Sequence, residues 1–280
     1  MVGVTLLWST AGVVARHLEH AQRFEVTFWR SFFTALSLLM ILLLFKGWGV
    51  FGRMRQGGSA LWVSGLCWSG MFTFFMVSIM LTTVANVLVA MSLTPLLTAV
   101  AARVFLGYRI PLRTWIAIVV AGFGIAYMYG QQLGQTAGLT GTLVALCVPI
   151  SGAINWTVTQ HSHAQGRNVD LVPAVLIGAV LSALVTLPLA WPFQASAHDL
   201  VLLGGLGVFQ LAVPCVLVVV CARVLKAPEV ALLGLLEVIF GILLAWVGAG
   251  EVPGPNVLVG GTLVIGALVV NEIVAWRVRA

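Results

Sequence analysis

The chain is a series of long apolar stretches joined by short polar junctions. About 20 apolar residues, at 1.5 Å of helix each, cross the roughly 30 Å hydrocarbon layer of a membrane. Breaking the sequence at charge clusters, Gly/Pro groups and polar runs gives ten such stretches. They lie near residues 2–16, 25–45, 60–82, 85–106, 112–130, 138–160, 171–191, 199–221, 228–248 and 255–275. The sequence therefore predicts an all-α integral membrane protein with ten transmembrane helices.

The composition excludes the other common classes of protein. Only 8% of the 280 residues are charged and 61% are hydrophobic, whereas about a quarter of the residues of a soluble domain are charged. So few ionised groups cannot form a water-facing surface, which excludes a soluble enzyme, a disordered chain and a nucleic-acid-binding module. We therefore expect the lipid bilayer as a partner, no nucleic acid, and no large domain outside the membrane.

The first stretch is short for a membrane crossing. It has about 15 residues before Arg16, against the usual 20. It lacks the basic start and the small-residue cleavage site of a secretory signal. We therefore expect a genuine first helix, whose start is clipped or which faces the interior of the bundle.

Basic residues collect at alternate junctions. One side of a ten-span arrangement holds the Lys and Arg residues within 46–55, 103–113 and 223–226, together with Arg167, Arg277 and Arg279. The opposite junctions carry Arg16 and Arg23, which Glu19 and Glu25 offset, and after these only the acidic residues Asp199 and Glu251. Because cytoplasmic loops collect Lys and Arg, both termini are predicted to be cytoplasmic, and this topology also accounts for the net charge of +6.

The two halves of the chain show a faint internal similarity. Laying Ala85–Gly124 on Ala227–Gly266 aligns Leu93 with Leu235 and Pro111 with Pro253. Five spans in each half is an odd number, so the second half would insert upside down relative to the first. We therefore predict two inverted five-helix repeats, residues 1–133 and 134–280.

Four short motifs stand in the first, second, fourth and ninth stretches. They are Leu7-Trp8-Ser9-Thr10, Trp29-Arg30-Ser31-Phe32, Leu93-Thr94-Pro95-Leu96-Leu97 and Leu235-Leu236-Glu237-Val238. In their order and spacing these motifs resemble the drug/metabolite transporter (DMT) superfamily, and best its EamA-type ten-helix branch. The resemblance covers nearly the whole chain. It implies a multi-pass protein of the inner (plasma) membrane that exports amino acids or similar metabolites by alternating access between inverted repeats.

A narrower resemblance concerns the substrate. Two motifs look most like those of the YddG-type exporters of aromatic amino acids. They are the Trp-Ser-Thr of the first stretch and Thr157-Val158-Thr159, which closes the sixth stretch. The Leu-Glu-Val of the ninth stretch follows the general EamA pattern instead. The substrates implied are aromatic or hydrophobic amino acids, with other amino acids, related metabolites and drugs left open.

Ionisable side chains inside hydrocarbon are costly, so they should face a cavity or a partner helix. Glu237 lies near the middle of the ninth stretch and is a candidate proton or amine contact. Its other reading is a protonated carboxyl hydrogen-bonded to a neighbouring helix. Arg30 could attract a carboxylate, or its long side chain could reach the outer headgroups.

Amide and indole side chains complete the predicted cavity. Amides cost less to bury than charges and can fix a zwitterion, although hydrogen bonding between helices competes as an explanation. The Asn155-Trp156 pair would offer a polar anchor beside an apolar wall, and the cluster Met71–Met76 suits an adaptable apolar pocket or core packing. The predicted cavity residues are Trp8, Ser9, Trp68, Asn86, Asn155, Trp156, Gln210 and Glu237. Pro95, Pro149 and Pro214 are predicted kinks or hinges.

A secondary carrier for small molecules fits these features best. A membrane enzyme would need clustered carboxylates, a metal set or an activated nucleophile, a channel a filter motif, and a receptor a sensory domain; the sequence contains none of these. It also has no phosphate-binding loop for ATP. We expect a monomer without cofactor or metal, either facilitated or proton-coupled; a broad drug/metabolite exporter coupled through Glu237 is the alternative.

Overall fold

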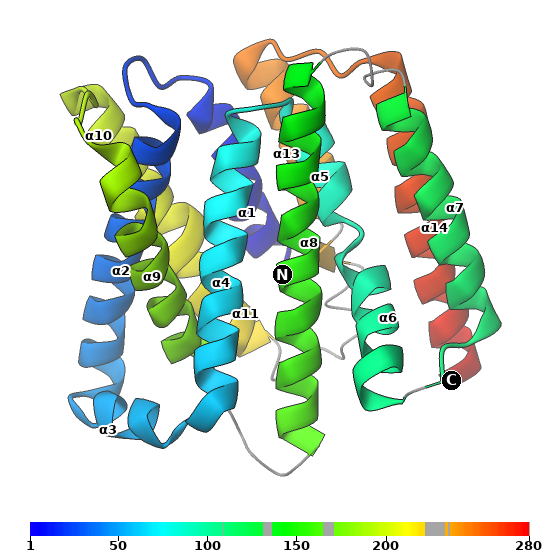
Figure 1. Cartoon of the computed structure of the whole chain (residues 1–280), viewed down its shortest axis with the longest axis horizontal. Helices are drawn as coiled ribbons and strands as arrows, with labels where there is room; N and C mark the ends of the chain where they lie inside the picture. The colour runs from blue at the N-terminus through cyan, green and yellow to red at the C-terminus, as the bar shows by residue number, and fades with distance from the viewer. Residues whose placement is uncertain (108, 131–135, 165–170, 222–232, 235, 280) are drawn as a thin grey trace.

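The computed structural model is a bundle of helices (Figure 1). It describes residues 1–107, 109–130, 136–164, 171–221, 233–234 and 236–279, and over these ranges it contains no strand. The helices are α1 (Val2–Ala15), α2 (Arg23–Lys46), α3 (Gly49–Gln56), α4 (Gly58–Ile79), α5 (Val84–Met91), α6 (Thr94–Leu106), α7 (Leu112–Gly130), α8 (Thr136–Ala164), α9 (Leu171–Ala190), α10 (Ala197–Gly205), the π-helix η1 (Leu206–Ala212), α11 (Val213–Cys221), α13 (Leu236–Ala249) and α14 (Pro255–Arg279).

The described helices follow the apolar stretches of the sequence. Seven segments are long and apolar enough to cross a membrane: Arg23–Lys46, Gly58–Ile79, Val84–Leu106, Thr140–Thr159, Val172–Ala190, Ala197–Val218 and Pro255–Arg277. Three shorter apolar helices, Val2–Ala15, Leu112–Met128 and Leu236–Ala249, occupy the remaining predicted stretches. The all-helical membrane class is thus confirmed. The number of helices that cross the bilayer, and the side on which the termini lie, stay predictions.

Helix contacts repeat with the two halves of the chain exchanged. The first helix of the first half, α1, contacts α13 and η1 of the second half. Correspondingly, the first helix of the second half, α8, contacts α5, α6 and α4 of the first half. Likewise α2 contacts η1 and α9 contacts α4, while α2 pairs with α9 and α7 with α14. Figure 1 shows α7 and α14 side by side. The predicted boundary at 133/134 and Leu235 lie outside the described residues, so the structure does not test the position of the boundary.

Small residues allow the last of these pairs to pack closely. A Cβ atom on Gly124 of α7 would lie 2.7 Å from the carbonyl oxygen of Gly260 in α14, and a Cβ on Gly260 would lie 2.5 Å from that of Gly124. Both obstacles are backbone atoms, which cannot rotate away. The glycines therefore set the distance between α7 and α14, as is common where membrane helices touch.

The three predicted kink prolines lie in different settings. The fourth stretch is broken at Ser92–Leu93, and Pro95 stands in the first turn of α6. Pro214 is the second residue of α11, the helix that begins directly after the π-helix η1. Pro149, in contrast, lies inside α8, which continues through it. Two of the three prolines thus mark a change of helix geometry.

The bundle has two distinct ends (Figure 1). One end carries α3 and the C-terminus, and basic residues collect there in the sequence. The other carries α10 and the connections 16–22, 80–83, 191–196 and 250–254. We call this second end the seal end, because hydrogen bonds between its connections hold them together. The predicted topology places the seal end outside the cytoplasm.

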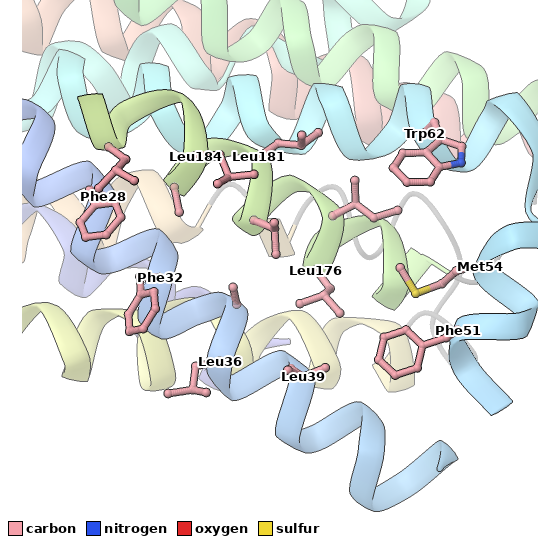
Figure 2. A pocket seen from close by; sticks show the side chains of 15 residues that line it. Phe28, Phe32, Leu36, Leu39, Phe51, Met54, Trp62, Leu176, Leu181 and Leu184 are labelled. Carbon is pink, nitrogen blue, oxygen red and sulfur yellow. The ribbon is translucent and has the colours of Figure 1, made fainter. Parts of the chain in front are cut away.

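An apolar groove of about 660 Å³ runs along the outside of the bundle between α2, α3, α4 and α9 (Figure 2). The side chains that line it are hydrophobic, and several are widely exposed, among them Leu36, Trp62 and Leu184. None of the predicted cavity residues lines it. This groove is therefore part of the surface that a bilayer would cover, and the polar site lies elsewhere.

Candidate functional site

A buried arginine forms the centre of the candidate site. Arg30 lies about two turns into α2, and only 1% of the residue is exposed. Its Nε and Nη2 atoms both donate to Oε1 of Gln210 in η1, at 3.1 and 2.9 Å. Arg30 therefore points into the bundle, and it does not extend toward the headgroups as its long side chain would allow.

Aromatic rings cover the guanidinium of Arg30. Its Cζ atom lies 5.9 Å from the ring centre of Phe72 and 5.4 Å from that of Phe75, both in α4. Such cation–π contacts each stabilise a buried cation by about 0.5–2 kcal/mol. The predicted cluster Met71–Met76 thus contributes two rings to the surroundings of a buried charge.

The structure describes both Arg30 and Glu237, the acidic residue predicted for this site, and shows no direct ion pair between them. Glu237 lies in the first turn of α13, one turn before Gly241, which packs near Ser9 of α1. Among the described residues, no carboxylate forms a direct ion pair with this guanidinium, and Nη1 of Arg30 is buried without a hydrogen-bond acceptor. A buried, unsatisfied donor is costly, and the cost is larger for a charged group. The site thus contains a strong donor that no described residue satisfies.

The π-helix η1 brings Gln210 to this position. Pro214 has no N–H, so it cannot form the α-helical bond to the carbonyl of Gln210. Gln210 is buried, and its Nε2 donates to the carbonyl of Trp8 at 3.2 Å. Its side chain therefore joins α1 to α2 through Arg30. Single π-helical turns are frequent at functional sites.

A glycine permits the close approach of η1 to α2. A Cβ atom on Gly207 would lie 2.6 Å from Cβ of Phe33, 2.8 Å from the amide of Thr34 and 3.0 Å from the carbonyl of Arg30. Thr34 Oγ1 also donates to the carbonyl of Gly207 at 3.3 Å. Gly207 therefore fixes the spacing that lets Gln210 reach Arg30.

Four of the predicted cavity residues surround Arg30 or neighbour it. The Trp8 carbonyl and Gln210 belong to its hydrogen-bonded group, and Glu237 lies on α13, which packs against α1. Ser9 is buried beside them in α1, packs near Gly241 of α13, and its Oγ donates to the carbonyl of Leu6 at 2.7 Å. These residues come from both halves of the chain, and Glu237 is partly exposed.

A second predicted group lies between α4 and α8. Asn155 is fully buried, and its Oδ1 accepts from Ser64 Oγ at 2.6 Å, while its Nδ2 is buried without an acceptor in the described part of the chain. The ring centre of Trp68 lies 5.5 Å from that of Phe72, with the two rings tilted by 46°, and this contact links the group to Arg30. Trp156 is 41% exposed, so it points away from Asn155, and the two do not line one surface.

Asn86 has a local role in this structure. It is buried at the start of α5, where its Nδ2 donates to Thr82 Oγ1 at 3.0 Å and its backbone amide to Thr83 Oγ1 at 3.3 Å. Both bonds satisfy polar groups at a helix N-terminus. The structure thus places Asn86 at the seal end.

Two buried carboxylates close the seal end in a reciprocal manner. Asp199, at the start of α10, accepts the backbone amides of Glu19, His20 and Ala21 in the first half at 2.8–3.1 Å. Glu25, at the start of α2, accepts the amides of 194 and 195 in the second half at 2.8–3.0 Å. Each half thus supplies a carboxylate to the connection of the other.

Both carboxylates also cap their own helices. Glu25 accepts the Gln22 amide at 3.4 Å and Asp199 accepts the Ser196 amide at 3.2 Å. These are the reciprocal bonds of a capping box. The sequence interpretation counted both acids only as junction charges, although Gln-x-x-Glu and Ser-x-x-Asp before apolar runs are the signal that could have identified them.

An ion pair adds a third contact at the seal end. Arg16 Nε contacts Glu251 Oε2 at 2.8 Å, and Arg16 Nη2 donates to the carbonyl of Thr82 at 2.7 Å. The other oxygen of Glu251 accepts the Val84 amide at 2.6 Å. The connections after α1, α4 and α13 are therefore joined. With the two capping carboxylates, the contact closes the seal end across the two halves.

Comparisons with known proteins agree with this architecture. A solved structure titled "Crystal structure of protein" matches 100% of this chain and 98% of its own, with a TM-score of 0.62 and 19% identity, a likeness of fold alone. No curated protein matches the sequence as a relative. The model of the EamA-like transporter family matches residues 1–130 and 139–272, which together form two repeats. The chain belongs to the EamA-like transporter family.

Proposed function

We propose that this protein is a secondary carrier that exports amino acids across the inner membrane by alternating access between its two repeats. The observation that carries the proposal is the buried, hydrogen-bonded pair Arg30 and Gln210, with the partly exposed Glu237 on the neighbouring α13, where helices of both halves meet. Charged groups inside a membrane bundle mark solute pathways, because their burial is otherwise costly. Family membership supports a transporter rather than an enzyme.

The exchanged contacts of the two halves support alternating access. If each half can adopt the conformation of the other, a second state exists in which their roles are swapped and the opposite end of the bundle is closed. In the present state the seal end is held shut by Asp199, Glu25 and the Arg16–Glu251 pair. Opening this end requires these bonds to break, which would release a substrate on the side opposite the basic junctions.

The surroundings of Arg30 favour aromatic and other hydrophobic amino acids. Phe72 and Phe75 lie against the guanidinium, and Trp68 packs on Phe72. Aromatic rings provide apolar contact surface for a side chain while the charged groups bind its polar end. This preference agrees with the YddG-type resemblance. We also propose that the carrier works as a monomer and that both of its termini lie in the cytoplasm.

Flux in proteoliposomes tests the proposal. The purified protein is reconstituted, and radiolabelled Phe, Trp, Thr, Met and Lys are supplied in parallel, with protein-free liposomes as the control. We expect saturable flux that is fastest for Phe and Trp. No flux above the control for any of the five, with and without a pH gradient, would refute amino-acid export.

A further inference from the structure

We infer that Arg30 binds the carboxylate of the transported amino acid through the Nη1–Nη2 edge of its guanidinium, while Glu237 attracts the ammonium group. This assignment rests on the proposed function and specifies the chemistry of its site. It follows from which donors of Arg30 are used in the structure, which faces are covered, and which charges stand nearby.

The hydrogen bonds of Arg30 leave one edge of the guanidinium without an acceptor among the described residues, and we call this edge the open edge. The group has five N–H donors in a planar fork, and pairs of them match the two oxygens of a carboxylate. Gln210 Oε1 takes the donors of Nε and one of Nη2. Nη1 is buried and has no acceptor in the described part of the chain. The remaining edge, Nη1 with the second donor of Nη2, is therefore the one that can receive a carboxylate in two-point fashion.

The rings restrict how a ligand can approach. Phe72 and Phe75 pack around the guanidinium, with ring centres 5.9 and 5.4 Å from Cζ. A neutral amide, Gln210, is its only hydrogen-bonding side chain among the described residues, so the charge is oriented without being neutralised by direct contact. A ligand that brings a carboxylate to the open edge would satisfy both the free donor and the charge.

The second charge selects a zwitterion. Glu237 lies one helical turn before Gly241 on α13, and Gly241 packs near Ser9 of α1, next to the Trp8 carbonyl that accepts from Gln210. Over the residues that the structure describes, Glu237 forms no ion pair with Arg30, and it is partly exposed. Arg30 belongs to the first half of the chain and Glu237 to the second. A molecule with a carboxylate and an ammonium group would be attracted by both residues at once. The ligand class is therefore the free α-amino acid rather than an amine or an acid alone.

Two blocked analogues separate this role from a purely structural one. Phenylalaninamide lacks the carboxylate, and N-acetylphenylalanine lacks the ammonium group. Each is used to inhibit labelled Phe flux in proteoliposomes. For the wild type we expect both analogues to inhibit at least about tenfold more weakly than unlabelled Phe, since a hydrogen-bonded contact to a charged group is lost.

The variants assign each contact to a residue. Arg30→Gln should raise the KM for Phe about tenfold or more and make phenylalaninamide nearly as effective as Phe, while the discrimination against N-acetylphenylalanine persists. Arg30→Lys keeps the charge but loses the fork, so it should lose much of the discrimination against the amide. Glu237→Gln should lose the discrimination against N-acetylphenylalanine and keep the discrimination against phenylalaninamide. Arg23→Gln, the same change at an exposed position of α2, should behave as the wild type.

The outcomes distinguish this inference from the proposed function. Equal inhibition by Phe and phenylalaninamide in the wild type would overturn the role of Arg30, even if both Arg30 variants failed to fold. Saturable Phe flux with unchanged analogue discrimination in the variants would also overturn it, and amino-acid export would stand. Absence of any amino-acid flux in the wild type would overturn both.

Discussion

Replacing Asp199 by alanine should open the seal end locally. The Asp199 carboxylate is fully buried and accepts three amides of the opposite half, from Glu19, His20 and Ala21, in addition to the Ser196 amide of its own capping box. Alanine at this position removes all four acceptor contacts. The connection between α1 and α2 would then lose its hydrogen-bonded attachment to α10.

The size of the effect follows from these contacts. A hydrogen bond to a charged group contributes about 1.5–3 kcal/mol when its partners are removed from water. Glu19 and His20 are exposed, so their amides can bond to water in the variant, whereas Ala21 is buried. Of the three bonds to the opposite half, we therefore count the bonds of Glu19 and His20 at less than their full value. The free energy of local opening then falls by about 3 kcal/mol in the variant. This corresponds to a change of about 150-fold in the local opening equilibrium.

Amide hydrogen exchange measures this opening directly. Exchange of amides 19–21 should accelerate by about two orders of magnitude in Asp199→Ala, while α7 and α14 exchange as in the wild type. Glu19→Gln is the matched control, because its carboxylate is exposed and, within the described ranges, makes only long contacts of 3.8 and 3.9 Å to His20 and His198. In Glu25→Ala the acceleration should appear instead at residues 194 and 195.

A small effect would refute this reasoning. If amides 19–21 of Asp199→Ala exchange within about threefold of the wild-type rate, the carboxylate does not hold the seal end, and the proposed gate has to be assigned to other contacts. Equal acceleration in Glu19→Gln would show that charge in this region, and not the acceptor geometry of Asp199, controls the opening.

Three further substitutions test packing and hydrogen bonding around the site. Gly207→Ala should lower the melting temperature, by an amount corresponding to about 1–3 kcal/mol, since its Cβ would overlap backbone atoms of α2; Gly204→Ala, whose nearest neighbour would be 3.8 Å away, should melt as the wild type, and equal melting of both variants would contradict the account. Asn155→Ala and Ser64→Ala should each destabilise by about 1–2 kcal/mol because each leaves a buried partner unsatisfied; the double variant should cost less than the sum, whereas additivity would deny their coupling.

The helices could be predicted from the sequence because apolar length alone decides them. Each described helix except the short α3, which lies in the junction between two stretches, falls on a predicted stretch. A segment that is apolar on most faces has no alternative to the bilayer. The breaks were harder to assign. Pro95 and Pro214 coincide with changes in helix geometry, but Pro149 does not. A proline removes one donor in every case, and whether the helix bends depends on the neighbours that pack against it.

The centre of the site could be anticipated only in part. Gln210 and Glu237 were predicted because polar groups are costly in hydrocarbon. In the structure Gln210 is hydrogen-bonded to Arg30, and Glu237 lies on α13, which packs against α1. The direction of Arg30 itself could not be predicted, because its side chain is long enough to reach either headgroups or interior. It was decided by Gln210, a residue 180 positions away. The orientation of Trp156 could not be predicted either. Its neighbour Asn155 is buried, whereas Trp156, one residue further along the helix, is exposed.

The seal end depends on contacts that a linear sequence does not display. The capping boxes of α2 and α10 are visible as local patterns, but the acceptance of amides from the other half is not. Asp199 and the Ala21 amide are 178 positions apart. Only the packing of α2 against α10 brings these groups together. Long-range pairs of this kind require the fold to be known.

Counterflow tests the central claim most directly. Proteoliposomes are loaded with a high concentration of unlabelled Phe and diluted into a trace of labelled Phe. A carrier that exposes one site alternately to the two sides returns inward with labelled substrate, so label should accumulate transiently above its external concentration and then decay. Accumulation that is absent from protein-free liposomes and weakened in Arg30→Gln would agree with alternating access through the Arg30 site. Label that only approaches the external concentration in liposomes that do transport Phe would show a pore open to both sides, and would contradict the account.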